Sequence, residues 1–156
     1  MGKWYKVTVK GFNQDPNGGR DKGVTEQYMF DALSYTEAEA RANKELQPLY
    51  KEFEVKKIDP VKVSELFLDS ENNGSRDKYF KCKINYITID EKKGKEKKTP
   101  AYIYVQASDP KDAESMLTIG MKGTMSDWSC ESIAETKIID VYKVDLSLPE
   151  ESKEEK

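Results

Sequence analysis

Hydrophobic and polar residues alternate along several segments of the chain, in the period-2 pattern that predicts half-buried β-strands. Within residues 4–10, Tyr5, Val7 and Val9 share one face, and Trp4 shares the other with lysine and threonine. The same alternation recurs over residues 26–32, 79–86 and 101–107. Polar, glycine-bearing connections join these segments in pairs, at residues 13–22 and 90–98. We therefore expect two antiparallel hairpins.

A helix is predicted after each hairpin, because a capping signal is followed by apolar residues at helical spacing. Ser34 precedes Glu37 by three residues, which forms a capping box, and Asp109 precedes a proline that suits the first helical position. The apolar stripes that follow are Ala38, Ala42, Leu46 and Leu49 in the first helix and Ala113, Leu117 and Met121 in the second. Each stripe predicts a helix that covers one face of a sheet.

A third strand is expected after each helix, over residues 53–58 and 128–133. Further apolar stretches follow at 61–68 and 137–144. Each is either a fourth strand or an extension of the third strand, and in the first copy such an extension bends at Pro60. The pattern thus predicts an α+β protein built from a β-β-α-β-β unit with an antiparallel sheet.

The unit occurs twice, because a shift of 75 residues aligns the chain with itself without a gap and places Trp4 on Tyr79. This tandem duplication predicts two lobes related by a pseudo-two-fold axis. The expected parts are a first lobe over 1–69, a linker over 70–78, a second lobe over 79–145 and a disordered acidic tail over 146–156.

Composition limits the partners and the compartment. The chain is 37% hydrophobic and 35% charged, so each unit has a thin core and is expected to need its twin for stability. A net charge of −3 disfavours binding to nucleic acid or to anionic membranes by bulk attraction alone. Because no apolar run or leader is visible, we expect a cytoplasmic protein. Cys82 and Cys130 match valines one repeat earlier, so both are interpreted as small core residues.

The chain lacks the residues on which several common catalytic mechanisms depend. The chain contains no histidine, which excludes imidazole acid–base catalysis and histidine-dependent triads. Gly18 and Gly19 lie in a hairpin that no helix follows, so they do not form a phosphate-binding loop. We therefore expect a protein that binds and does not catalyse, with no cofactor.

Two oxygen-rich loops imitate calcium sites without completing them. The residues concerned are Asp15, Asn17, Asp21 and Glu26 in the first loop and Asp69, Glu71, Asn73 and Gly74 in the second. Arg20 stands where the first loop needs glycine, and Phe80 stands where the second needs a bidentate glutamate. We interpret both as solvated turns and expect no metal site.

Carboxylates in the predicted helices are accounted for mainly by capping and dipole roles. They are Glu37, Glu39, Glu45, Asp112 and Glu114. A hydrolase that uses carboxylates alone is consequently the least favoured interpretation.

The strongest candidate for binding is the sheet face opposite the helices. It is expected to display Trp4, Lys6, Lys10, Tyr79, Lys81, Lys83, Tyr102 and Tyr104. Aromatic and basic side chains of this kind stack on bases and contact phosphates, so a single-stranded nucleic-acid-binding protein is one hypothesis. Aromatic residues are also enriched at protein interfaces. We favour an adaptor that contacts a protein partner, or a second copy of itself, through this face or through a sheet edge.

Several ordered motifs resemble an uncharacterised family of short bacterial and phage proteins, classed as a domain of unknown function. They are Trp4–Val7, Asp31–Arg41, Tyr79–Lys83, Gly94–Lys98 and Gly120–Met125. The resemblance implies no reaction, cofactor or functional residue. It supports a cytoplasmic setting and suggests a connection with phages or mobile elements.

Overall fold

The computed structural model describes residues 3–12, 23–70 and 74–143. In these residues two four-stranded sheets each carry one helix, which confirms the predicted α+β class. Neither helix in the described part is long and apolar enough to cross a bilayer. The predicted hairpin loop at 13–22, part of the linker and the predicted acidic tail lie outside the described residues.

Two compact units make up the structure: unit 1, residues 1–61 with 140–156, and unit 2, residues 62–139. The sheet of unit 1 has the strand order β3-β1-β2-β8. Its strands are β1 (Lys3–Phe12), β2 (Val24–Ala32), β3 (Glu52–Val61) and β8 (Ile138–Tyr142). Helix α1 (Tyr35–Leu46) contacts β1, β2 and β3. β1 is central and pairs antiparallel with both β2 and β3.

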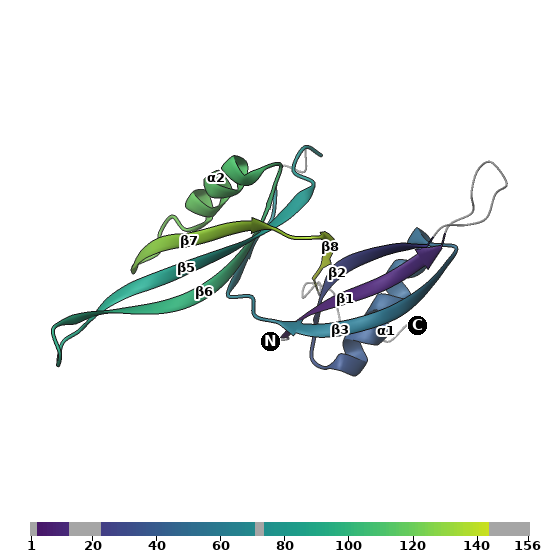
Figure 1. Cartoon of the computed structure of the whole chain (residues 1–156), viewed down its shortest axis with the longest axis horizontal. Coiled ribbons are helices and arrows are strands. Elements are labelled where there is room, and N and C mark those ends of the chain that lie inside the picture. Colours follow the sequence, from purple (N-terminus) through teal and green to yellow (C-terminus); the bar gives the residue numbers. More distant parts are fainter. Residues whose placement is uncertain (1–2, 13–22, 71–73, 144–156) are drawn as a thin grey trace. The chain divides into compact units, whose positions relative to one another are not determined.

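Unit 2 repeats this plan with the strand order β4-β6-β5-β7. Its strands are β4 (Glu65–Phe67), β5 (Lys78–Asp90), β6 (Lys95–Ala107) and β7 (Asp127–Glu135). Figure 1 shows α2 (Pro110–Gly120) lying over one side of this sheet, where it contacts β6 most extensively.

Local details recur at the 75-residue shift. Lys3 pairs with Ala32 in the first hairpin, and Lys78 pairs with Ala107 in the second. The pairing of each third strand shifts at the same place, between Thr8 and Val9 and between Lys83 and Ile84. These observations agree with two copies of one unit, while the pseudo-two-fold axis stays a prediction.

Both predicted helix starts are confirmed. Ser34 accepts a hydrogen bond from the amide of Glu37 at 3.2 Å, and Asp109 accepts one from the amide of Asp112 at 2.8 Å. In α1 the Glu37 carboxylate also accepts a hydrogen bond from the amide of Leu33, the residue before the cap. Local side chains thus satisfy backbone donors that the helix leaves free.

The predicted core faces are also confirmed. The buried side chains include Val7, Val9, Phe30, Ala42 and Leu46 in unit 1, and Phe80, Cys82, Ile84, Val105 and Leu117 in unit 2. The placement of Leu49 on the helical stripe was wrong, because Leu49 is 47% exposed. Helix α1 ends at Leu46, and the tighter 3-10 turn over Gln47–Leu49 rotates Leu49 away from the core.

The fourth strands do not stay with their own repeats. β4 follows the first repeat but pairs in parallel with β6 of the second, with Phe67 opposite Val105. β8 follows the second repeat but lies beside β2 of the first, where Tyr142 stacks on Phe30 at 4.7 Å. The compact units therefore differ from the predicted lobes 1–69 and 79–145, because each sheet is completed by a strand from the other repeat.

The end of the predicted linker is held by an ion-pair network. Arg76 donates Nε to Asp112 Oδ2 at 2.9 Å and Nη1 to Asp69 Oδ1 at 3.1 Å. Asp112 also accepts the amide of Ser108 at 3.0 Å. The bonds from Arg76 and Ser108 hold the pKa of Asp112 below its ordinary value. The linker is therefore attached to the start of α2.

We expect Asp112→Asn to lower the stability of unit 2 by about 1 kcal/mol or less at pH 7, since the ion pair is partly solvated. The pKa of Asp112 is lower in the folded protein than in the unfolded chain, where it is near 4. Its carboxylate therefore stabilises the fold fully above pH 4, and this stabilisation is lost as the pH falls through the pKa of the folded state. The measurement is urea unfolding at pH 7 and below pH 3. The difference in the free energy of unfolding between wild type and variant should disappear in acid. A difference that is independent of pH would contradict this role.

Candidate functional site

The eight residues of the predicted binding face are divided between the two sheets. Trp4, Lys6 and Lys10 lie on β1 of unit 1, whereas Tyr79, Lys81, Lys83, Tyr102 and Tyr104 lie on β5 and β6 of unit 2. The structure therefore assembles the last five on one sheet, where Lys81 pairs with Tyr104 and Lys83 with Tyr102.

Several side chains of the predicted binding face are buried or contact other residues of the protein. Tyr79 and Tyr104 are only 5% and 4% exposed. The Nζ of Lys81 lies 4.9 Å from the centre of the Tyr102 ring, a cation–π arrangement. Lys83 lies 3.5 Å from Glu131. The sequence pattern assigned these residues to the correct strands but did not reveal their burial or their internal contacts.

The lysine-rich connection at 90–98 forms a projecting two-stranded ribbon. β7 pairs with β5 only as far as Ile87, whereas the β5–β6 pairing continues to Asp90 and Lys95 (Figure 1). Gly94 closes the turn with a φ of 63°, and its amide donates to the Asp90 carbonyl at 2.7 Å. The lysines of this ribbon are exposed to solvent: Lys92, Lys93, Lys95, Lys97 and Lys98.

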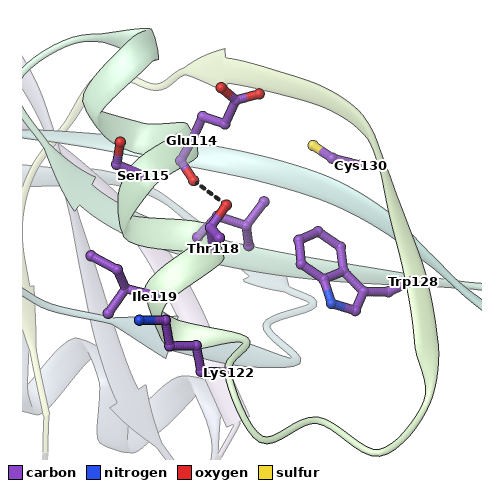
Figure 2. A pocket seen from close by; sticks show the side chains of 8 residues that line it. Glu114, Ser115, Thr118, Ile119, Lys122, Trp128 and Cys130 are labelled. Atoms are coloured by element: carbon purple, nitrogen blue, oxygen red, sulfur yellow. Dashed lines mark hydrogen bonds between the residues drawn. The ribbon is translucent and has the colours of Figure 1, made fainter.

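A groove that the sequence analysis missed lies between α2 and β7. It has a volume of about 470 Å³ and is lined by Glu114, Ser115, Leu117, Thr118, Ile119, Lys122, Trp128 and Cys130. Figure 2 shows the side chains of Trp128 and Cys130 projecting from β7 towards α2. Thr118 donates its hydroxyl to the Glu114 carbonyl at 2.9 Å, so it is held against its own helix. The groove combines an indole wall with a mixed polar helix surface.

The two repeats place an aromatic residue beside the third strand from different positions of the sequence. In unit 1 the Tyr50 ring lies 5.9 Å from Phe53, the residue that matches Trp128. The residue that matches Tyr50 in the second repeat is Met125, which is 99% exposed. Tyr86, which pairs opposite Trp128, instead supplies the aromatic neighbour of the third strand in unit 2. Comparing the repeats residue by residue was the available sequence signal for this difference.

Gly11 explains how Tyr50 fits into unit 1. A Cβ on Gly11 would lie 2.2 Å from the Tyr50 ring, so only glycine leaves room for it. The second repeat carries Tyr86 at the position of Gly11, and Tyr86 packs on the core of unit 2. Tyr50 in unit 1 and Tyr86 in unit 2 thus reach the core from different positions of the repeat.

β7 also presents an open backbone edge, since it is the last strand of its sheet. Its sequence, DWSCESIAE, contains three acidic residues and no basic residue. The corresponding edge strand of unit 1, β3, contains Pro60 and two lysines, features that discourage further strand pairing. An edge strand beside a groove is an arrangement that accepts an extended peptide.

The prediction that both cysteines are core residues holds for Cys82 and was wrong for Cys130, which is exposed. Cys130 lies on the edge strand, where only α2 covers one side. Burial raises the pKa of the Cys82 thiol to about 12, and desolvation also raises that of Cys130. Because the thiolate is the reactive form, neither thiol is activated as a nucleophile.

Glu26, Tyr28 and Tyr50 are joined by hydrogen bonds between their side chains. Glu26, once a candidate calcium ligand, accepts a hydrogen bond from the Tyr50 hydroxyl, which is also 2.6 Å from the Tyr28 hydroxyl. Burial, together with the bond to Glu26, raises the pKa of Tyr50. No group of three metal-binding side chains is found among the residues that the structure describes.

The fold defines a class of protein: an α+β chain with two four-stranded sheets that each carry one helix. A family model described as a domain of unknown function (DUF4494) matches residues 3–144, and the chain belongs to this family. The predicted resemblance to an uncharacterised family is thereby confirmed, whereas a bacterial or phage origin stays a prediction. No curated protein and no solved structure matches the chain.

Proposed function

We propose that this protein is a non-catalytic adaptor that holds a protein partner on the exposed surface of its second repeat. The observation that supports this function best is the groove between α2 and β7, with Trp128 in its wall and an unpaired strand edge beside it. Tryptophan is among the residues that contribute most to protein interfaces. The resemblance to bacterial and phage proteins leads us to place this activity in the bacterial cytoplasm.

A nucleic-acid-binding protein is the second candidate, and the lysine-rich ribbon favours it. Lys92, Lys93 and Lys95 are exposed at the tip of the ribbon, and Tyr102 lies further along the same strand as Lys95, β6. Two observations weigh against it. Tyr79 and Tyr104 are buried, and Lys83 is paired with Glu131, so fewer side chains remain for bases and phosphates.

Site-specific photo-crosslinking tests the adaptor function. Benzoylphenylalanine in place of Trp128 should yield a discrete protein adduct in cells that naturally contain the protein. The same group in place of Leu33, which is 67% exposed in unit 1, should yield none. Equal adducts from both positions, or none from either, would contradict the proposal.

The nucleic-acid alternative is examined with labelled single-stranded DNA and RNA at several salt concentrations. The adaptor hypothesis predicts no saturable binding. Saturable binding that weakens with salt, with a log–log slope of about −0.7 per phosphate contact, and that is lost in Tyr102→Ala, would establish the second candidate instead.

A further inference from the structure

We propose that the outer edge of β2 in unit 1 is a strand-binding site that accepts β8 from a second copy of this chain, which gives a strand-exchanged dimer. In the structure this edge is occupied by β8 of the same chain. The inference goes beyond the adaptor function and does not depend on it.

Two edges in the structure bind a strand of the same kind. β4 pairs with β6 in unit 2, and β8 lies beside β2 in unit 1. The 75-residue shift places β2 on the end of β6, and it places Glu65–Phe67 of β4 on Asp140–Tyr142 of β8. In both strands the acidic residue is exposed and the next two side chains are half-buried. Both edges therefore take a segment with the order acidic, aliphatic, aromatic.

The aromatic residue is the anchor of each strand. Phe67 lies opposite Val105 and packs on the core of unit 2. Tyr142 packs on the core of unit 1, where it stacks on Phe30 at 4.7 Å with an interplanar angle of 6°. The shift places Phe30 on Val105, so the two anchors occupy matching positions.

The helix of each unit reaches its anchor from a matching position as well. A Cβ on Gly120 of α2 would lie 2.4 Å from the Phe67 ring, and the shift places Glu45 of α1 on Gly120. Burial, together with the nearby charges of Asp140 and Glu45, raises the pKa of Tyr142 to about 12. The Tyr142 hydroxyl is therefore neutral in the site near pH 7.

A second copy is the occupant that this site fits. Unit 1 is interrupted after residue 61 by the whole of unit 2, and β8 completes it afterwards. Thr136 and Lys137 alone join β7 to β8, so β8 is carried at the end of unit 2. Unit 2 of a second copy carries the identical strand, which makes the same contacts in the site. Exchange of identical elements is a low-cost route to dimers.

The length of β8 favours its exchange. β8 has five residues, whereas β3, at the opposite edge of the sheet, pairs with β1 from Trp4 to Phe12. A short edge strand opens at a lower free energy than the rest of its sheet. The strand of the same chain competes at an effective concentration on the order of millimolar, so the dimer forms when the chain approaches this concentration.

The test is to refold a mixture of ¹³C-labelled and unlabelled full chain from urea, at about 1 mM and at about 10 µM. Light scattering should show a dimer at the higher concentration and a monomer at the lower one. An isotope-filtered NOE should join Phe30 of one chain to Tyr142 of the other, because their rings stack at 4.7 Å. Tyr142→Ala should abolish the dimer, whereas Lys143→Ala, at the exposed next position, should retain it. A dimer without this NOE, or a monomer at both concentrations, would overturn the inference.

A peptide keeps the test decisive if Tyr142→Ala unfolds unit 1. The probe is the acetylated and amidated peptide of residues 137–143, Lys-Ile-Ile-Asp-Val-Tyr-Lys, titrated into the ¹⁵N-labelled Tyr142→Ala chain. It should shift the amides of β2 and α1, or restore the dispersed signals of β1 and β2 where the variant has lost them. The same peptide with alanine for tyrosine should bind about tenfold more weakly or worse. The wild-type chain, whose own β8 fills the site, should bind the peptide more weakly than the variant. Equal affinity for both peptides, or shifts centred in unit 2, would reject the site.

Discussion

Tyr50→Ala is expected to destabilise unit 1 by about 3–5 kcal/mol, the range for removing a large aromatic side chain from a core. Tyr50 is 7% exposed and packs with Phe53 above Gly11. Its removal leaves a cavity and also takes a hydrogen-bond partner from Tyr28 and from Glu26. The measurement is urea unfolding followed by the fluorescence of Trp4 in a Trp128→Phe background, since the chain has two tryptophans and unit 1 contains Trp4.

The second repeat supplies a matched control for this experiment. Met125 occupies the position that corresponds to Tyr50 and is 99% exposed, so Met125→Ala should change stability by less than about 0.5 kcal/mol. Tyr50→Phe keeps the ring and separates the contribution of the hydroxyl, expected at about 1 kcal/mol. If Tyr50→Ala and Met125→Ala had similar small effects, the packing of Tyr50 over Gly11 would not stabilise unit 1 as described.

Gly120→Ala is expected to destabilise unit 2 by about 1–3 kcal/mol through overpacking. In most helices this substitution stabilises by up to about 1 kcal/mol, because alanine has the higher helix propensity. Here a Cβ would lie 2.4 Å from the ring of Phe67 and 2.6 Å from its Cγ, so ring rotation alone does not relieve the clash. The fluorescence of Trp128 in a Trp4→Phe background reports the unfolding of unit 2.

The effect of Gly120→Ala on stability should change sign when the Phe67 ring is removed, which makes this prediction specific. In a Phe67→Ala background the clash is absent, so Gly120→Ala should become neutral or stabilising. Glu45→Ala, at the matching exposed position of α1, serves as the control. Destabilisation that persists without the Phe67 ring would show that the close approach of β4 to α2 is not its cause.

Both predictions concern a glycine beneath an aromatic ring, and the two cases differ in their origin. Gly11 and Tyr50 belong to the first repeat and to unit 1. Phe67, in contrast, follows the first repeat in sequence but packs on the core of unit 2. The Gly120–Phe67 contact therefore links the segment after one repeat to the helix of the other.

The candidate site was only partly accessible from sequence. The aromatic and basic residues of β5 and β6 were placed on the correct strands because period-2 alternation specifies faces. Their burial depends on what covers a face, which alternation does not specify. The groove between α2 and β7 was missed because it depends on how the helix and the edge strand pack against each other, which alternation along the chain does not specify.

The amino-acid sequence by itself determined the strands, the helix starts and the core faces, since each depends on residues a few positions apart, and the 75-residue self-match predicted the duplication. Ser34 and Glu37 are three positions apart, and Val7 and Val9 are two. Tertiary structure alone decided the exchange of β4 and β8, the contact of Arg76 with Asp112 and the open edge of β7. The physical reason is that these features join residues distant in the chain, where the choice of partner depends on packing, charge and space.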